Sequence, residues 1–322
     1  MALLALLAGA LGSCDGSQVV RPADNGVLWT RLTSTGIQNA IYPDVLADSM
    51  VFTAIGRDLG FGFWDRLAFS LAEDGAGAVV TGFLGASPWT DYRPRWVRSA
   101  MIVYESNRGG DFDIYYRDVD TFDDHRLFTS PLNETAPAPR PNAPGLAYVE
   151  YDNNASTAGS ANLRGRVVLI PDTAAVPLER IYLTPDTLRC GEPAWDPTGQ
   201  RLAFSVENSA DFTRHLYTMS LAPGDSLPVQ ITTGASHDFS PRWSADGNRI
   251  LFASDRTGRW GLWLVHPSGE ANGLQLISFD DRGGVVLTPA WTSDGLGIIA
   301  SSNGRGGVRS LWLLSNLPVF DF

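Results

Sequence analysis

Residues 240–258 read SPRWSADGNRILFASDRTG, and GLWLV follows at residues 261–265. The proline suits the start of a short first strand, where a missing amide costs the sheet little. The Asp-Gly pair supplies the positive φ angle of a tight hairpin turn, and the apolar run after it predicts a second strand. After another Gly-bearing turn, residues 261–265 and 274–277 predict a third and a fourth strand. The segment therefore predicts one four-stranded antiparallel sheet.

The same pattern recurs along the chain. Two copies carry the same Pro-x-Trp anchor followed by a Gly-bearing turn. A third has the anchor but lacks the Asp-Gly turn, and two more match the pattern only weakly. The six anchoring prolines are expected at positions 43, 94, 139, 193, 241 and 289. Self-similarity at a period near 50 residues, with one four-stranded sheet in each period, is typical of propeller blades. The chain is therefore predicted to be all-β, a six-bladed β-propeller with four-stranded antiparallel blades.

The two ends of the repeated region are expected to meet. The last repeat stops after its third strand, at residues 311–314, and has no fourth strand of its own. Residues 27–33, however, resemble the fourth strands of the other repeats and precede any first strand. We expect this N-terminal strand to close the last blade, because such pairing removes the two open sheet edges that would otherwise invite aggregation.

The amino terminus resembles a bacterial lipoprotein signal. Residues 2–12 are apolar and too short to cross a bilayer. They end in Leu-Gly-Ser-Cys, which resembles a lipobox, although no basic residue precedes the apolar run. The resemblance implies a lipoprotein signal peptide over 1–13 and lipidation of Cys14. Together with the repeats, it predicts a tether over 14–26 and a single six-bladed β-propeller domain over 27–322. An ordinary secretory signal is the alternative.

The repeats themselves resemble a known family. The combination of Pro-x-Trp, Asp-Gly and a later Ser-x-Arg-x-Gly turn resembles the repeat of TolB and of the propeller domains of prolyl oligopeptidase relatives. The resemblance covers roughly residues 27–316 and implies the propeller fold together with a binding task in the cell envelope. It does not transfer a partner, because similar propellers serve different tasks. TolB has a further α/β domain that we do not expect in the residues between Cys14 and the closing strand.

The sequence offers little for catalysis or for nucleic acid. No Gly-x-Ser-x-Gly elbow of a serine hydrolase is present, and the four histidines lack metal-ligand spacing. The acidic run 111–124 does not fit an EF-hand, so a solvated hairpin turn is the stronger interpretation and a calcium loop the weaker one. A formal net charge of -11 argues against nucleic acid. No catalytic residue, metal or cofactor is predicted.

Most aromatic and basic residues of the repeats are assigned to structure. The tryptophans that recur at fixed blade positions are expected in the core: Trp96, Trp195, Trp243, Trp263, Trp291 and Trp312. The arginines that follow the second strands are expected to bond local carbonyls and carboxylates: Arg57, Arg108, Arg256 and Arg305. Cys190 is expected to be a small core residue.

Five residues remain as candidates for a binding surface. His237 and Asp238 precede a first strand, near the expected mouth of the axial channel. Trp64, Trp89 and Trp260 fall off the repeat pattern and are expected in loops. The leading hypothesis is a non-enzymatic, monomeric lipoprotein that binds an envelope protein or peptide on the periplasmic side of a bacterial membrane. A carbohydrate-binding or lyase-type propeller that uses the axial funnel is the alternative, and a sensor-like accessory of an envelope complex is a third hypothesis.

Overall fold

The computed structural model describes residues 19–20, 26–33, 39–47, 49–58, 62–72, 79–83, 89–151, 165–222, 224, 227–279, 284–304, 307 and 309–318. Residues 1–18, which hold the predicted signal peptide and Cys14, lie outside this set. Within it the chain forms β-strands and one short 3-10 turn, Glu270–Asn272. No helix among these residues has the length and apolar character needed to span a bilayer.

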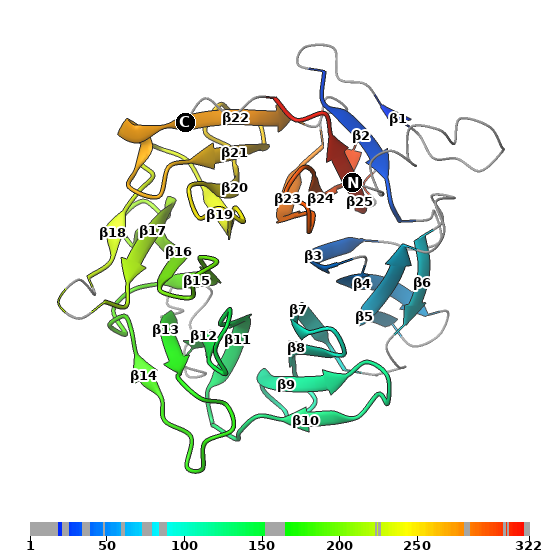
Figure 1. Cartoon of the computed structure of the whole chain (residues 1–322), viewed down its shortest axis with the longest axis vertical. Helices are drawn as coiled ribbons and strands as arrows, with labels where there is room; N and C mark the ends of the chain where they lie inside the picture. The colour runs from blue at the N-terminus through cyan, green and yellow to red at the C-terminus, as the bar shows by residue number, and fades with distance from the viewer. Residues whose placement is uncertain are drawn as a thin grey trace.

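Sheets of four antiparallel strands are arranged around a common axis, with the first strand of each innermost (Figure 1). The first two are β3 (Ala40–Leu46), β4 (Ser49–Asp58), β5 (Gly62–Ala72) and β6 (Val79–Phe83), then β7 (Asp91–Arg98), β8 (Met101–Ser106), β9 (Asp113–Asp118) and β10 (Asp124–Arg126). The third is β11 (Asn133–Pro139), β12 (Leu146–Tyr151), β13 (Gly165–Ile170) and β14 (Ile181–Tyr182). The fourth and fifth are β15 (Cys190–Trp195), β16 (Arg201–Glu207), β17 (Arg214–Ser220) and β18 (Val229–Gln230), then β19 (Asp238–Trp243), β20 (Ile250–Ser254), β21 (Gly261–Val265) and β22 (Leu274–Phe279). The all-β propeller with four-stranded antiparallel blades is thus confirmed for these five sheets.

The remaining sheet differs from the prediction in its strand number. It contains β23 (Val286–Trp291), β24 (Ile298–Ser302) and β25 (Ser310–Ser315), and β2 (Leu28–Arg31) pairs with β25 as expected for the N-terminal closing strand. A fifth strand, β1 (Val19–Val20), pairs with the outer edge of β2. The expectation of four strands in this blade is therefore wrong, because two extended residues upstream of the closing strand pair with the free edge of β2.

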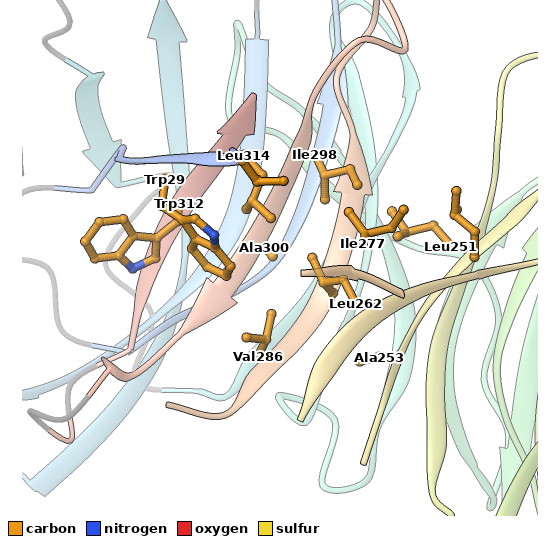
Figure 2. Close-up of a cluster of buried hydrophobic side chains, with 12 residues drawn as sticks. Trp29, Leu251, Ala253, Leu262, Ile277, Val286, Ile298, Ala300, Trp312 and Leu314 are labelled. Atoms are coloured by element: carbon orange, nitrogen blue, oxygen red, sulfur yellow. The ribbon is translucent and has the colours of Figure 1, made fainter. Parts of the chain in front are cut away.

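The closing strand is held by side chains as well as by its backbone. Trp29 packs edge-to-face on Trp312, with ring centroids 6.5 Å apart. Its indole N–H also donates to the Ser278 hydroxyl at 3.2 Å, which ties β2 to the last strand of the preceding sheet. Figure 2 shows both tryptophans at one end of an apolar cluster that continues through Val286 and Leu251. β2 therefore joins the cores of the last two sheets.

The innermost strands share a backbone irregularity that decides which side chains face the axis. In each of them the register with the second strand shifts at a residue that precedes a proline. These residues adopt left-handed φ angles of 47 to 54°: Tyr42, Arg93, Ala136, Glu192, Ser240 and Thr288. Such bulges re-aim side chains and recur at functional rims. They also correct one anchor, because the bulge of β11 places Pro137 at the anchor position and not Pro139.

The recurring tryptophans of the first strands connect neighbouring sheets. The Trp195 indole donates to the carbonyl of Ala138 at 3.0 Å, and the Trp243 indole donates to the carbonyl of Ala194 at 3.1 Å. Each bond therefore runs from one innermost strand to the preceding one, while the ring fills the space between the sheets. The predicted core role is confirmed for Trp96, Trp195 and Trp243 and for Cys190, which are buried, whereas Trp291 is only partly buried.

Candidate functional site

A narrow cavity, here called the axial cavity, lies between the innermost strands of five sheets. Three of its lining side chains are arginines and only one is a carboxylate, in a protein with a formal net charge of -11. The lining residues are Tyr42, Arg93, Arg95, Ala136, Pro137, Glu192, Pro193 and Arg242. The axial cavity therefore brings together arginines from two different sheets.

Arg93 lines this cavity from β7. Its Nη1 lies 2.5 Å from Glu105 Oε1, and its Nη2 donates to the Tyr42 hydroxyl at 3.1 Å. The guanidinium also lies over the Tyr42 ring, 4.6 Å from its centroid. Burial works against the charge, but Glu105 and Tyr42 outweigh it and hold the pKa of Arg93 well above its usual value. Arg93 is thus a fixed, paired cation.

Glu192 is the one carboxylate among the lining residues, and it is held from the neighbouring strand. Its Oε2 accepts hydrogen bonds from the Ser240 backbone N–H at 2.7 Å and from the Ser240 hydroxyl at 2.8 Å. Its Oε1 lies 4.0 Å from Arg93 Nε. Although burial opposes ionisation, Arg93 and these hydrogen bonds lower the pKa of Glu192. The residue is therefore an anion, and one of its two oxygens is taken up by hydrogen bonds to Ser240.

A second feature lies at the start of β19. The rings of His237 and Phe239 stack with centroids 6.2 Å apart, and Phe239 stacks on Trp260 at 5.5 Å. The Arg214 guanidinium lies 5.0 Å from the Phe239 ring centroid. All three rings are half-buried, so each keeps an accessible part. Aromatic rings beside an arginine form a surface that suits cation–π and stacking contacts.

This stack continues onto the neighbouring sheet. Glu207 bridges two arginines, 2.7 Å from Arg189 Nη1 and 2.9 Å from Arg214 Nη2. The Arg189 guanidinium in turn lies 5.8 Å from the ring centroid of Phe212, which is 50% exposed. We call the connected set the aromatic–arginine cluster. It comprises Arg189, Phe212, Arg214, His237, Phe239 and Trp260.

The predicted site residues fall in different places. His237 and Trp260 are brought together through Phe239. Trp89 lies in the segment before β7, in another blade, and is 47% exposed. Trp64 is on β5 opposite Gly56 and not in a loop as expected, and its side chain is outside what the structure describes.

Asp238 has a supporting role next to the cluster. Its carboxylate is fully buried, and Arg256 Nη2 donates to both of its oxygens at 3.2 Å. The second sheet repeats this arrangement, with Arg108 Nη2 3.3 Å from Asp91 Oδ1. The prediction that the recurring arginines bond local carboxylates is confirmed for these two, whereas the side chains of Arg57 and Arg305 lie outside the described set. Asp238 therefore positions the start of β19.

The acidic run 111–124 is largely taken up by arginines and turn amides. Asp124 Oδ2 lies 2.6 Å from both Arg108 Nη1 and Arg117 Nη2. Asp118 accepts from two backbone amides of its own turn. Among the described residues, no three metal-ligating side chains converge. The run thus includes a hydrogen-bonded hairpin turn.

Sequence reasoning missed the residues of the axial cavity. A signal for them was present, because each of the correctly placed anchoring prolines is preceded by the bulged residue that faces the axis. The sequence alone could not show that Arg93, Glu192 and Arg242 lie close together, because they come from three different repeats.

Comparison with known proteins agrees with this geometry. Residues 179–313 match the family described as the TolB beta propeller domain. The structure of TolB from Acinetobacter baumannii superposes with a TM-score of 0.59 and 14% identity, over 93% of this chain and 79% of that one. The chain has a TolB-like β-propeller.

Two other likenesses belong to enzymes. The TolB-like propeller superposes on an oligogalacturonate lyase in complex with manganese with a TM-score of 0.60 and 14% identity, over 94% of this chain and 96% of that one. It is 32% identical over 122 residues to the uncharacterized peptidase YuxL of Bacillus subtilis, which is 36% of this chain but 18% of that protein. The chain therefore matches less than a fifth of that relative, and the structural likenesses show the fold alone.

Proposed function

We propose that this TolB-like propeller is a non-enzymatic binding scaffold of the bacterial cell envelope, tethered by a lipid on Cys14, that holds a segment of another protein at the aromatic–arginine cluster. The observation that carries the proposal is the continuous run of accessible rings and guanidinium groups across two blades. Protein interfaces are enriched in aromatic residues and arginine, and a few such residues supply most of the binding energy.

The position of the cluster also supports binding. It is built from the hairpin between β16 and β17, the hairpin between β20 and β21, and the segment that leads into β19. Successive antiparallel connections alternate between the two ends of a blade, so these three lie at one end of the ring. Phe212 and Trp260 can therefore contact one partner that approaches along the axis.

The proposal is tested by affinity purification from native envelope membranes with the full-length protein. Wild-type protein is expected to retain a partner that the double variant Phe239→Ala, Trp260→Ala loses, with affinity reduced about 30-fold or more, as for other interface hot spots. Phe122→Ala is the matched control, because Phe122 is 54% exposed but lies in the turn between β9 and β10, at the opposite end of the ring. Equal capture by both variants would contradict the proposal.

A carbohydrate-binding or lyase-type function is the second candidate, and the stack of His237 and Trp260 favours it to a lesser degree. Aromatic rings also bind sugars by stacking, and a histidine beside them is a potential acid or base. A glycan-binding screen together with metal analysis separates the two functions. Sugar affinity that is lost in Trp260→Ala, or a divalent metal bound near His237, would favour the carbohydrate function over protein binding.

A further inference from the structure

Two of the three arginines that line the axial cavity are in direct contact with a carboxylate. Arg93 is paired with Glu105, as described above. Arg95 is paired with Asp44, its Nη1 lying 3.0 Å from Asp44 Oδ1, and the other oxygen of that carboxylate accepts from the Trp96 backbone N–H at 2.8 Å. Glu192 is engaged by Ser240. These pairings account for the carboxylates around the cavity.

Arg242 is the cation that remains. No carboxylate of the described residues lies within 4.0 Å of its guanidinium, its Nε is buried without a hydrogen-bond partner, and its Nη1 donates only to the carbonyl of Pro241 at 3.0 Å. Burial and the nearby positive charge of Arg95 lower the pKa of Arg242 to about 9, against the opposing effect of the negative charges of Asp44 and Glu192. A buried guanidinium is normally paired with an acceptor, because leaving it unpaired is costly.

The same residue faces the cavity. Arg242 lines the axial cavity and is half-buried as a whole, while its Nε is covered. It lies in the second half of β19, whereas the aromatic–arginine cluster adjoins the beginning of that strand. A guanidinium presents a rigid fork of N–H donors that matches a carboxylate, and such charge-assisted bonds are the strong ones.

From these observations we infer that the axial cavity is a carboxylate-binding site in which Arg242 is the anchoring residue. The ligand is either a small free carboxylic acid or the acidic side chain of a protein segment that enters the axis. The site is distinct from the aromatic–arginine cluster, and neither depends on the other. Arg95, which is paired with Asp44, lies beside this site.

The test follows the Nε–H signal of Arg242 by NMR in protein labelled with ¹⁵N-arginine. That signal is assigned by its loss in Arg242→Gln. Two probes distinguish the source of the carboxylate: succinate represents a free acid, and a blocked glycine peptide with one glutamate represents a protein side chain. At least one probe is expected to shift the Arg242 signal in a saturable way.

Calorimetric titration of variants then assigns the binding to this residue. Arg242→Gln should weaken the affinity for that probe at least 10-fold, whereas Arg242→Lys should retain part of it. Arg98→Gln is the control, because Arg98 is an exposed arginine at the end of β7. The inference is overturned if neither probe shifts the signal in the wild-type protein, or if Arg242→Gln binds as tightly as Arg98→Gln.

Discussion

Replacing Glu134 by glutamine is expected to stabilise the protein at alkaline pH. The Glu134 side chain is fully buried in β11, and neither carboxylate oxygen accepts a hydrogen bond. Burial raises the pKa of Glu134 to about 8, with Ser130 opposing the shift and the negative charges of Asp113 and Glu150 adding to it. A buried carboxyl group beside other carboxylates favours its neutral form, so the folded protein holds a proton here.

The magnitude follows from this difference between the folded and unfolded chains. The ordinary pKa is 4.5, so between pH 4.5 and 8 the folded state keeps a proton that the unfolded state has released. The free energy of unfolding therefore falls as pH rises through this window, by up to about 1.4 kcal/mol per pH unit. The full shift corresponds to about 5 kcal/mol, which solvent screening and local relaxation reduce to about 2–3 kcal/mol.

The assay is thermal unfolding followed by tryptophan fluorescence at pH 5, 6.5 and 8. Wild-type protein and Glu134→Gln should melt together at pH 5, where Glu134 is already protonated. At pH 8 the variant should melt about 5 °C higher. Its amide can donate to Asp113 Oδ2, which is buried and has no hydrogen bond. If the variant differed from the wild type by the same amount at pH 5 and pH 8, the argument from an unpaired carboxylate would be refuted.

Glu150→Gln provides a control of opposite sign. Glu150 faces Glu134 across the β11–β12 pair and is also buried, but Arg166 Nη2 lies 2.6 Å and Arg180 Nη1 3.1 Å from its oxygens. Glutamine keeps one acceptor oxygen, but it removes the negative charge that pairs with both arginines. The variant should melt below the wild type at all three pH values.

Three further substitutions test the closing strand, the repeated arginine and the bulge. Trp29→Ala should lower the free energy of unfolding by about 3–5 kcal/mol in urea denaturation, and a loss under 1 kcal/mol would show that the indole does not hold the closing strand. Arg108→Gln leaves the buried Asp91 without its guanidinium, so a loss of about 3 kcal/mol is expected in the same assay, and unchanged stability would contradict that pairing. Ala136→Gly relieves a left-handed φ of 51° and should raise the melting temperature by about 1 °C, whereas a lower melting temperature would speak against the bulge.

The blade pattern could be predicted because the same local chemistry is repeated. Pro-x-Trp, Asp-Gly and an apolar run each specify short-range structure, and repetition made the pattern visible even in worn copies. The third anchor was misplaced because Pro137 and Pro139 both fit the local pattern. The choice between them depends on the pairing of Ala138 with Ala147, which is a property of the folded sheet. The strand at Val19–Val20 carried no turn or periodic signal.

The candidate site was only partly predictable for a related reason. His237 and Trp260 were found because they depart from the repeat, but Phe239, which joins them, sits at a regular strand position. Arg242 was read only as part of a Pro-x-Trp segment. Its significance depends on Asp44 and Arg95, which belong to other repeats. No local sequence pattern predicts that Arg95, and not Arg242, pairs with the Asp44 carboxylate.

The axial ring separates the part of the repeat that builds the fold from the part that varies. The bulge and the following proline are the same in each innermost strand, yet the bulged residues are all different: Tyr42, Arg93, Ala136, Glu192, Ser240 and Thr288. A left-handed residue with a side chain costs about 1 kcal/mol, and glycine would avoid that cost at each of these positions. None of them is glycine. The varied side chains offset that cost by contacts between neighbouring innermost strands, as Arg93 does with Tyr42 and Ser240 with Glu192, so the axial ring is the place where otherwise similar repeats differ in chemistry.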